Sequence, residues 1–172
     1  MSNLEDDVAR LIAESDIRNT IYRYAVAIDE FDEPGVRSVF ADDAVATYWN
    51  HPSLYGGDAI ADFVNGAADG QIVQHHLLNV YHVDVDGSEA KARVYHTSHQ
   101  WFDDAPFTDV VMVGRYRMDL RKVQGIWLIS MLEMELLWAE SRPLEPTLLE
   151  AMAGRGPANR QPRVPERSRG IR

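Results

Sequence analysis

The sequence predicts an α+β domain whose helices pack on one face of a mostly antiparallel sheet. Apolar residues recur at three- and four-residue spacing over residues 4–30, and four strand-like segments follow one another between residues 75 and 138. Turn residues separate those segments. At 172 residues the chain is long enough for one domain with a buried core and an internal cavity. We expect residues 1–142 to form this domain and residues 143–172 to be a C-terminal extension.

The predicted helices come first in the chain. The amphipathic pattern of residues 4–30 can break near Ser15 and Asp16, either of which can cap a second part. Asp29 stands at the end of this helix. Pro34 opens a short second helix up to residue 40, because proline suits a first helical turn. A third helix follows Asp58 and ends before the glycines at 66 and 70.

The predicted strands begin with residues 44–49 and continue after the third helix. The longer ones cover residues 75–87, 89–102, 109–123 and 125–138. The last of them is almost continuously apolar, which a helix also allows, but its place after Gln124-Gly125 favours a strand. Helices followed by a run of antiparallel strands imply helices on one face of a sheet.

Composition excludes several classes of protein. The chain has no cysteine, which excludes disulfides, thiolate metal sites and thiol nucleophiles. Its acidic N-terminus and short apolar runs predict neither a signal peptide nor a membrane helix, so we expect a cytoplasmic protein. Residues 153–172 carry a charge of +5 and the remainder −15, which disfavours nucleic acid as a partner. The basic extension, rich in Arg, Pro and Gly, is expected to be disordered or to lie on an acidic neighbouring subunit.

Cofactor and metal signatures are also missing from the sequence. It has no G-x-G-x-x-G, GK[ST] or G-x-S-x-G segment, so neither a nucleotide cofactor nor a serine elbow is expected. His75-His76 and His96-x-x-His99 have odd spacings, which place their members on opposite faces of a strand. His75 and His96 can reach one ion only across adjacent strands and with a third ligand such as Asp29. We expect no metal and no cofactor.

Three stretches resemble a known family. They are IRNTIYRYAVAIDEFDEPGVRSVFADDAVATYW, QHHLLNVYHVDVDGSEAKARVYH and VGRYRMDLRKVQGIWLISMLEME, which cover most of residues 15–137. Their order and spacing are similar to the SnoaL-like branch of the nuclear transport factor 2-like superfamily. The resemblance implies a conical barrel, a curved sheet wrapped around the long helix, with an apolar pocket at one end. It also implies a homo-oligomer, either a dimer or a trimer.

The same resemblance implies a set of site residues. Dehydratases and a dehydrochlorinase of this family place an Asp at the end of the long helix and a His in a strand, which are matched here by Asp29 and by His75 in Gln74-His75…Asn79. A second histidine of scytalone dehydratase is matched by His96 in Tyr95-His96. Tyr48 matches a pocket tyrosine of scytalone dehydratase, and Tyr24 one of bile-acid dehydratase.

Two departures from the family pattern concern the same site. Ile28 stands where scytalone dehydratase has a tyrosine, which puts the same carbonyl-binding geometry in doubt. His76 adjoins His75, and alternation along a strand lets only one of the two face the pocket. The spacing to Asn79 favours His75, so His76 is expected to face away.

A histidine paired with a carboxylate can accept a proton near neutral pH. We therefore expect a cofactor-independent lyase of the dehydratase type, in which Asp29 orients His75 and in which His96, Tyr48 and Tyr24 hold the substrate oxygen. In the alternative arrangement Asp29 pairs with His96. A hydrophobic, aromatic or polycyclic oxygenated small molecule is the expected substrate. Other side chains that can line the pocket include Trp49 and Trp138.

Other functions remain open at the level of the sequence. The same Asp–His pair can serve a double-bond isomerase, a polyketide-type cyclase or a C–C lyase that releases formaldehyde. Epoxide hydrolysis needs a carboxylate pair and a held water, which a pocket histidine makes less favourable. A non-enzymatic module that binds a small molecule or assists assembly is the alternative outside catalysis, because this fold by itself does not imply an activity.

Overall fold

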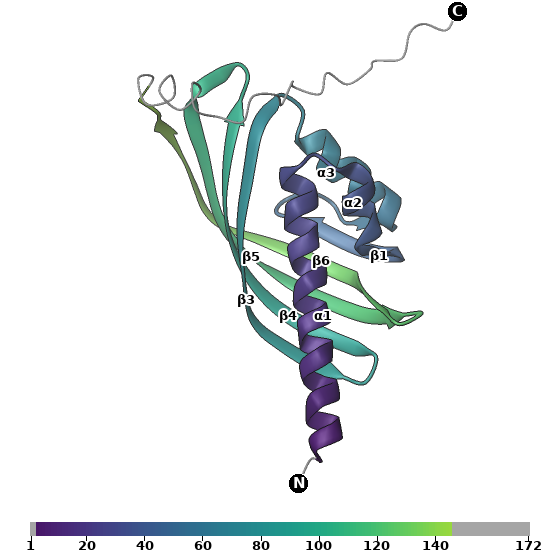
Figure 1. Ribbon diagram of the computed structural model, residues 1–172. Coiled ribbons are helices and arrows are strands. Elements are labelled where there is room, and N and C mark those ends of the chain that lie inside the picture. Colours follow the sequence, from purple (N-terminus) through teal and green to yellow (C-terminus); the bar gives the residue numbers. More distant parts are fainter. Residues whose placement is uncertain (1–2, 146–172) are drawn as a thin grey trace, which may run out of the picture.

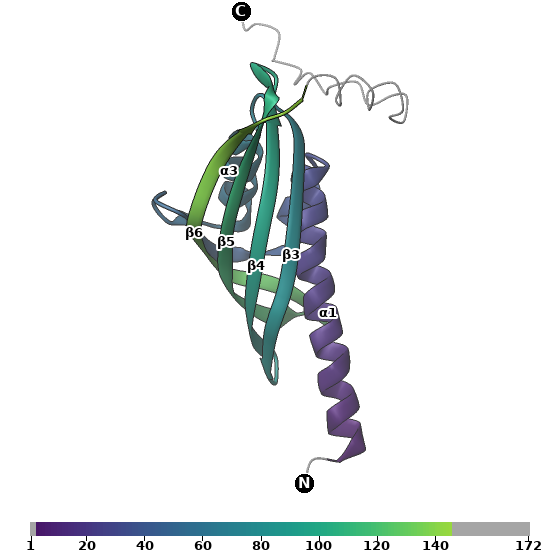
Figure 2. The ribbon, with the colours of Figure 1, turned by 90° about the vertical axis from the view of Figure 1, so that its left-hand side faces the viewer.

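The structure is a computed structural model that describes residues 3–145, and its main feature is a curved sheet with α1 along its concave face (Figures 1 and 2). The elements are α1 (Leu4–Asp29), α2 (Glu33–Ser38), β1 (Phe40–Tyr48), β2 (Leu54–Tyr55), α3 (Gly57–Ala67), β3 (Gln71–Asp86), β4 (Glu89–Phe102), β5 (Ala105–Val123) and β6 (Ile126–Pro143). The strand order is β2-β1-β6-β5-β4-β3, and among the described strands only the β1–β6 pair is parallel. The predicted α+β class is confirmed, although the sheet does not close into a barrel.

α1 is one continuous helix, so the break expected near Ser15 and Asp16 does not exist. Its N-cap is Asn3, whose side chain accepts a hydrogen bond from the backbone N–H of Asp6 at 2.9 Å. Ser15 and Asp16 are exposed, and short polar side chains on the solvent side do not interrupt a helix. The buried residues recur from Ala13 to the end of the helix, which packs this part onto the sheet.

The four long strands, β3 to β6, follow one another as antiparallel neighbours. Gly87 turns β3 into β4 with a φ of 60°. Gln124 and Gly125 both have positive φ and turn β5 into β6, as a two-residue hairpin requires. The apolar segment that follows Gln124-Gly125 is a strand, as its position predicts, and it continues to Pro143.

The core lies between α1 and the concave face of the sheet. It consists of apolar side chains from α1 and from all the long strands, among them Ile17, Ile21, Phe40, Val94, Met118, Trp127, Ile129 and Leu132. α2 packs against α1, and α3 packs against α2 and β1 (Figure 1).

α1 also covers the free edge of β3, and this positions the end of the helix. Asp29 accepts hydrogen bonds from the backbone N–H of His76, at 3.0 Å to each carboxylate oxygen. Further down the edge, Arg18 donates from Nη1 to the carbonyl oxygen of Val80 at 2.7 Å. An uncovered edge strand leaves unpaired backbone groups that invite association, so these side chains satisfy the edge and fix the register of α1 on it.

None of the described helices is long and apolar enough to span a membrane. The predicted C-terminal extension lies outside the described residues from position 146 onward.

Candidate active site

An Asp–His pair joins the end of α1 to the edge strand β3. The Nδ1–H of His76 donates to Oδ1 of Asp29 at 2.7 Å, in addition to the backbone hydrogen bonds of the same residue. The side chain of His76 is only 8% exposed and that of Asp29 is 23% exposed. Because Nδ1 carries the proton that Asp29 accepts, Nε2 of the neutral ring is the free acceptor.

The structure corrects the expected orientation of the two neighbouring histidines. His75 turns to the opposite face of β3, where its side chain is 59% exposed and its Nδ1 lies 3.9 Å from Oδ2 of Asp29. Asn79, whose spacing favoured His75, is exposed as well. His76, which was expected to face away, is the histidine that points inward and binds Asp29.

A β-bulge determines which of the two neighbouring histidines faces the core. In the later part of β3 the inward residues are Val83 and Val85, which have odd numbers. Strict alternation along the whole strand would therefore place His75 on the inward face. The pairing with β4 shifts register between Val80 and His82. A bulge of one residue reverses which side chains face the core, so upstream of it the even-numbered residues point inward.

His96 lies in β4 beside His76 on the concave face. It is 3% exposed, and its ring is nearly parallel to that of His76, with centroids 6.4 Å apart. Burial, together with the neighbouring His76, lowers the pKa of His96 from 6.5 to about 4, so the ring is neutral at neutral pH. Among the described residues its Nδ1 has no hydrogen-bond partner.

Gly114 makes room for the His96 ring. It is the residue directly opposite His96 on β5. A Cβ at this position would lie 2.5 Å from Cε1 of His96 and 2.5 Å from the carbonyl oxygen of Glu135. A larger side chain would therefore have to displace both the ring and the backbone of β6.

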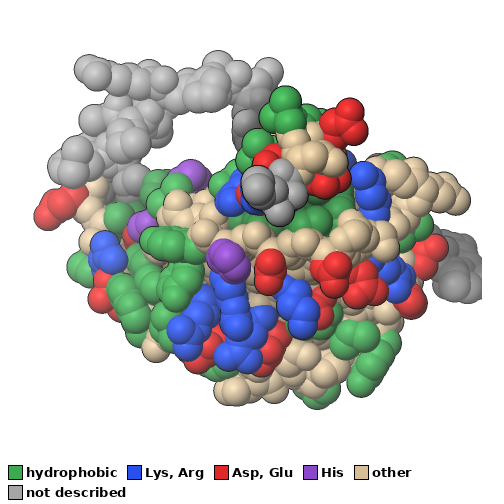
Figure 3. Space-filling view, turned by 90° about the horizontal axis from the view of Figure 1, so that it is seen from below, with side chains coloured by type: hydrophobic (Ala, Val, Ile, Leu, Met, Phe, Trp, Pro, Cys, Tyr) green, Lys and Arg blue, Asp and Glu red, His purple; other side chains and the backbone are tan. Residues whose placement is uncertain are grey.

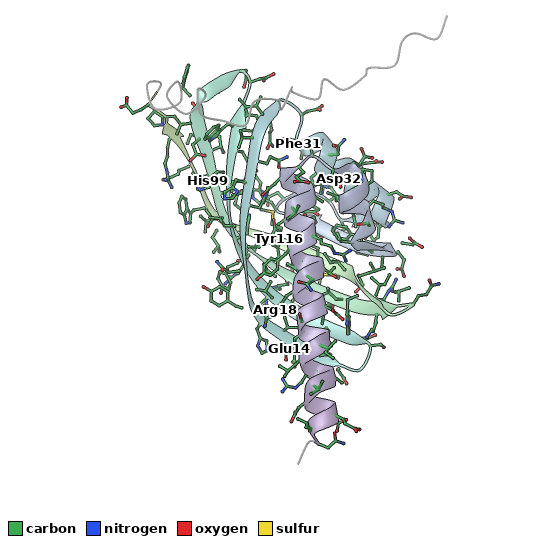
Figure 4. The ribbon with its side chains drawn as sticks, in the orientation of Figure 1. Glu14, Arg18, Phe31, Asp32, His99 and Tyr116 are labelled. Atoms are coloured by element: carbon green, nitrogen blue, oxygen red, sulfur yellow. The ribbon has the colours of Figure 1, made fainter. Side chains whose placement is uncertain are left out.

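Three tyrosines continue the site toward β1. The hydroxyls of Tyr24 and Tyr48 form a hydrogen bond of 2.8 Å. Tyr116 packs against His96, with ring centroids 4.8 Å apart, and is labelled between the sheet and α1 in Figure 4. Burial raises the pKa of all three phenols, so they are neutral hydrogen-bond donors.

Two inward residues, Ser98 and Tyr116, are not among the site residues expected from the sequence. Ser98 is buried and lies directly opposite His76 on β4. Tyr116 has the same inward phase on β5 as the buried Met118. The alternation of residues along β5 indicates that Tyr116 points inward, but an inward tyrosine is equally typical of a hydrophobic core.

Two tryptophans expected at the pocket lie elsewhere. Trp49, at the end of β1, is more than half exposed. Trp138 is also exposed. It lies opposite Val113, whose side chain is on the face of the sheet opposite to His96. Long apolar residues in strands were assigned to the pocket by type, but the phase of each strand decides which face they occupy.

A small open groove lies at the end of α1. Its walls come from α1, α2, α3 and the start of β3, and include Ile28, Phe31, Val64 and Gln74. Phe31 and Asp32, labelled in Figure 4, mark its position at the upper end of α1. Ile28 and Gln74 are close in sequence to Asp29 and His76, but neither member of the Asp–His pair lines this groove.

A second Asp–His pair lies on the convex face. His99 donates from Nδ1 to Oδ2 of Asp109 at 2.8 Å, and Trp101 donates from Nε1 to Oδ1 at 3.3 Å. The exposed ring of His75 is the cross-strand neighbour of His99, with centroids 6.5 Å apart. Asp109 itself is buried, so its charge is held by these two donors.

In the part of the chain that the structure describes, no group of three or more His, Cys, Asp or Glu side chains is arranged to hold a metal ion. The combination considered from the sequence, His75 with His96 and Asp29, is excluded because the two histidines face opposite sides of the sheet. On the concave side the side chains suit acid–base chemistry, because an oriented imidazole lies beside a buried neutral imidazole and phenolic donors follow it.

The chain belongs to the SnoaL-like domain family, whose model matches residues 9–133. Among curated proteins, none matches the chain in sequence.

Several solved structures share the fold. A scytalone dehydratase-like protein from Novosphingobium aromaticivorans DSM 12444 is 19% identical, with 79% of this chain and 91% of that one covered and a TM-score of 0.71. Hexachlorocyclohexane dehydrochlorinase LinA-type3 from Novosphingobium barchaimii LL02 is 16% identical, with 79% and 94% covered and a TM-score of 0.72. A ketosteroid isomerase-like protein from Erwinia carotovora atroseptica SCRI1043 is 16% identical, with 72% and 95% covered and a TM-score of 0.63. At these identities the likeness establishes the fold and leaves the activity to the site.

Proposed function

We propose that this protein is a cofactor-independent lyase of the dehydratase type, with His76 as the base in place of His75. The observation that carries the proposal is the 2.7 Å hydrogen bond from Nδ1 of His76 to Asp29. This bond holds the tautomer that leaves Nε2 free to accept a proton, and the carboxylate stabilises the imidazolium that forms. The named activities of the fold neighbours, a dehydratase-like protein and a dehydrochlorinase, are both eliminations and agree with it.

In the proposed reaction Nε2 of His76 takes the proton next to a carbonyl group of the substrate. The electron pair moves toward the carbonyl oxygen, where a phenol of the Tyr24–Tyr48 pair donates a hydrogen bond. As the enolate collapses, the β-hydroxyl leaves with the proton carried by His76, so the products are water and a conjugated double bond. His96 contributes as a neutral hydrogen-bonding group, because its lowered pKa keeps it uncharged.

The substrate in this proposal is a hydrophobic oxygenated small molecule, aromatic or polycyclic. The side chains beside the Asp–His pair are imidazoles, phenols and aliphatic groups, and such groups suit flat apolar compounds with a few oxygens. The same groups serve double-bond isomerisation if His76 returns its proton to another carbon, and the isomerase-like fold neighbour agrees with that variant. Association into a homo-oligomer and a cytoplasmic location stay part of the proposal.

A comparison of two adjacent histidines tests the proposal. The purified full chain is assayed against a panel of β-hydroxy ketones and polycyclic enones by the absorbance of the conjugated product. We expect His76→Ala to lower the rate by about 100-fold or more, and the matched variant His75→Ala to keep it within about twofold. A full rate in His76→Ala contradicts the assignment of the base. Tight binding without turnover by the unmodified protein identifies a binding module instead.

A further inference from the structure

α1 carries two apolar faces on opposite sides. One packs on the sheet, with Ile17, Ile21 and Tyr24 fully buried. The other faces solvent, away from the sheet, and contains six large apolar residues, each between 42% and 79% exposed: Leu4, Val8, Leu11, Ile12, Tyr22 and Val26. At 100° per residue these six fall within one stripe along the helix. We define them as the outer stripe of α1.

The first part of α1 has no support from the core. Residues 3–12 include no buried residue, and this part extends past the lower end of the sheet (Figures 1 and 2). Figure 3, which views the molecule from the end where α1 begins, shows hydrophobic side chains exposed among charged ones. Helices of this length are marginal in water without packing. A partner on the outer stripe would supply that packing.

We propose that the outer stripe is the contact between two copies of this chain, with the two α1 helices antiparallel. This rests on the proposed self-association and names its surface and its stoichiometry, a dimer. Because the outer stripe lies on the side of α1 opposite its buried residues, this contact places the two bodies on opposite sides of the helix pair. A symmetric dimer uses the same surface on both copies, as a single stripe requires.

Charge selects the antiparallel direction. The first turn of α1 is acidic, with Glu5, Asp6 and Asp7, while Arg18 and Arg23 lie in its second half. Glu5 and Arg23 are eighteen residues apart, which is about five full turns, so they occupy the same flank of the stripe. In an antiparallel pair equal flanks meet, and Glu5 of one copy faces Arg23 of the other. A parallel pair would bring the two acidic turns together.

The length of the contact between the two helices determines how tightly the dimer associates. Aligning Glu5 with Arg23 overlaps residues 4 to 24, a strip of about 30 Å at about 1.5 Å per residue that contains the outer stripe except Val26. Its contact area is at the small end of specific interfaces, so the dimer dissociates on dilution.

Sedimentation velocity of the full chain over a wide range of concentration tests this surface. We expect a dimer at high concentration and a monomer on dilution. Val8→Glu with Leu11→Glu should raise the dissociation constant by about tenfold or more, since each removes an apolar contact and adds a charge. The matched control, Leu77→Glu with Leu137→Glu, changes two exposed leucines of β3 and β6 and should leave it unchanged. Circular dichroism verifies that both variants fold.

A charge swap tests the direction. Glu5→Arg alone and Arg23→Glu alone should each weaken the dimer by about fivefold, because the symmetric pair contains the contact twice. The double variant should restore it. A monomer at every concentration contradicts both the proposed self-association and the proposed contact through the outer stripe. A dimer that survives Val8→Glu with Leu11→Glu, or one lost with Leu77→Glu and Leu137→Glu, overturns the α1 contact but leaves self-association and the lyase proposal standing.

Discussion

Two Asp–His pairs lie on opposite faces of the same sheet, and they differ in their surroundings. On the concave face His76 binds Asp29 at 2.7 Å, and on the convex face His99 binds Asp109 at 2.8 Å. Each imidazole uses Nδ1, so each presents Nε2 as the acceptor. The hydrogen bond alone therefore does not distinguish a catalytic pair from a structural one.

The environment does distinguish them. His76 faces a buried neutral histidine, His96, and the phenols beyond it, under the cover of α1. His99, labelled in Figure 4 on the side of the sheet away from α1, adjoins the exposed His75. Enclosure strengthens hydrogen bonds to a developing charge, while an open face leaves them screened by water. A titratable pair becomes a site candidate through the groups that converge on it.

The largest expected difference between the pairs is in turnover. Asp29→Asn should lower the rate by about 10²- to 10⁴-fold, because the amide no longer holds the reactive tautomer of His76. Asp109→Asn is its matched control and should keep the rate within about twofold. Rates are compared on whichever compound of the panel the unmodified protein converts. Equal losses of rate in Asp29→Asn and Asp109→Asn would contradict the assignment of catalysis to the concave face.

The next effect is a pH dependence of stability that comes from His96. Its pKa is about 4 in the folded protein and about 6.5 when unfolded, so between these values the unfolded chain binds more protons. The free energy of unfolding should therefore fall as pH drops from about 6.5 to about 4, on the order of 3 kcal/mol for this group. Urea titrations measure it.

A neighbouring substitution controls for the other groups that titrate in the same range. His96→Gln should flatten the pH dependence by that amount. Ser98→Ala, on the same strand and the same face, should leave it unchanged, because a serine does not titrate. If the free energy of unfolding of His96→Gln kept the same dependence on pH, burial would not be holding His96 neutral.

On the convex face the expected effect is structural. Asp109→Asn replaces the charged acceptor of His99 and Trp101 with an amide, which should cost about 2 kcal/mol of unfolding free energy. Thermal and urea unfolding measure the loss. No loss of stability would mean that the buried carboxylate contributes nothing to the fold.

The smallest effect should come from His75. Its ring is exposed and lies 3.9 Å from the nearer oxygen of Asp29, too far for a hydrogen bond. His75→Ala should change the unfolding free energy by less than about 0.5 kcal/mol. A larger loss, measured by the same urea unfolding, would give the convex face a role in holding Asp29.

Much of the architecture was predictable because it depends on local patterns. The long helix, the strand that follows Gln124-Gly125 and the position of Asp29 at the end of α1 all follow from apolar spacing and turn residues. The continuity of α1 was not predicted, because Ser15 and Asp16 are residue types that often cap helices. They do not interrupt this helix because both lie on its exposed side.

By itself the sequence determined that Asp29 closes a long amphipathic helix, that strands follow in antiparallel order, and that histidines stand in two of them. Periodicity carries this information, because each element must bury one face. Only the tertiary structure decided that His76 and not His75 meets Asp29, since a bulge between Val80 and His82 reverses the facing of β3. A shift of one residue in a strand has no signature in composition, yet it decides which side chain reaches the site.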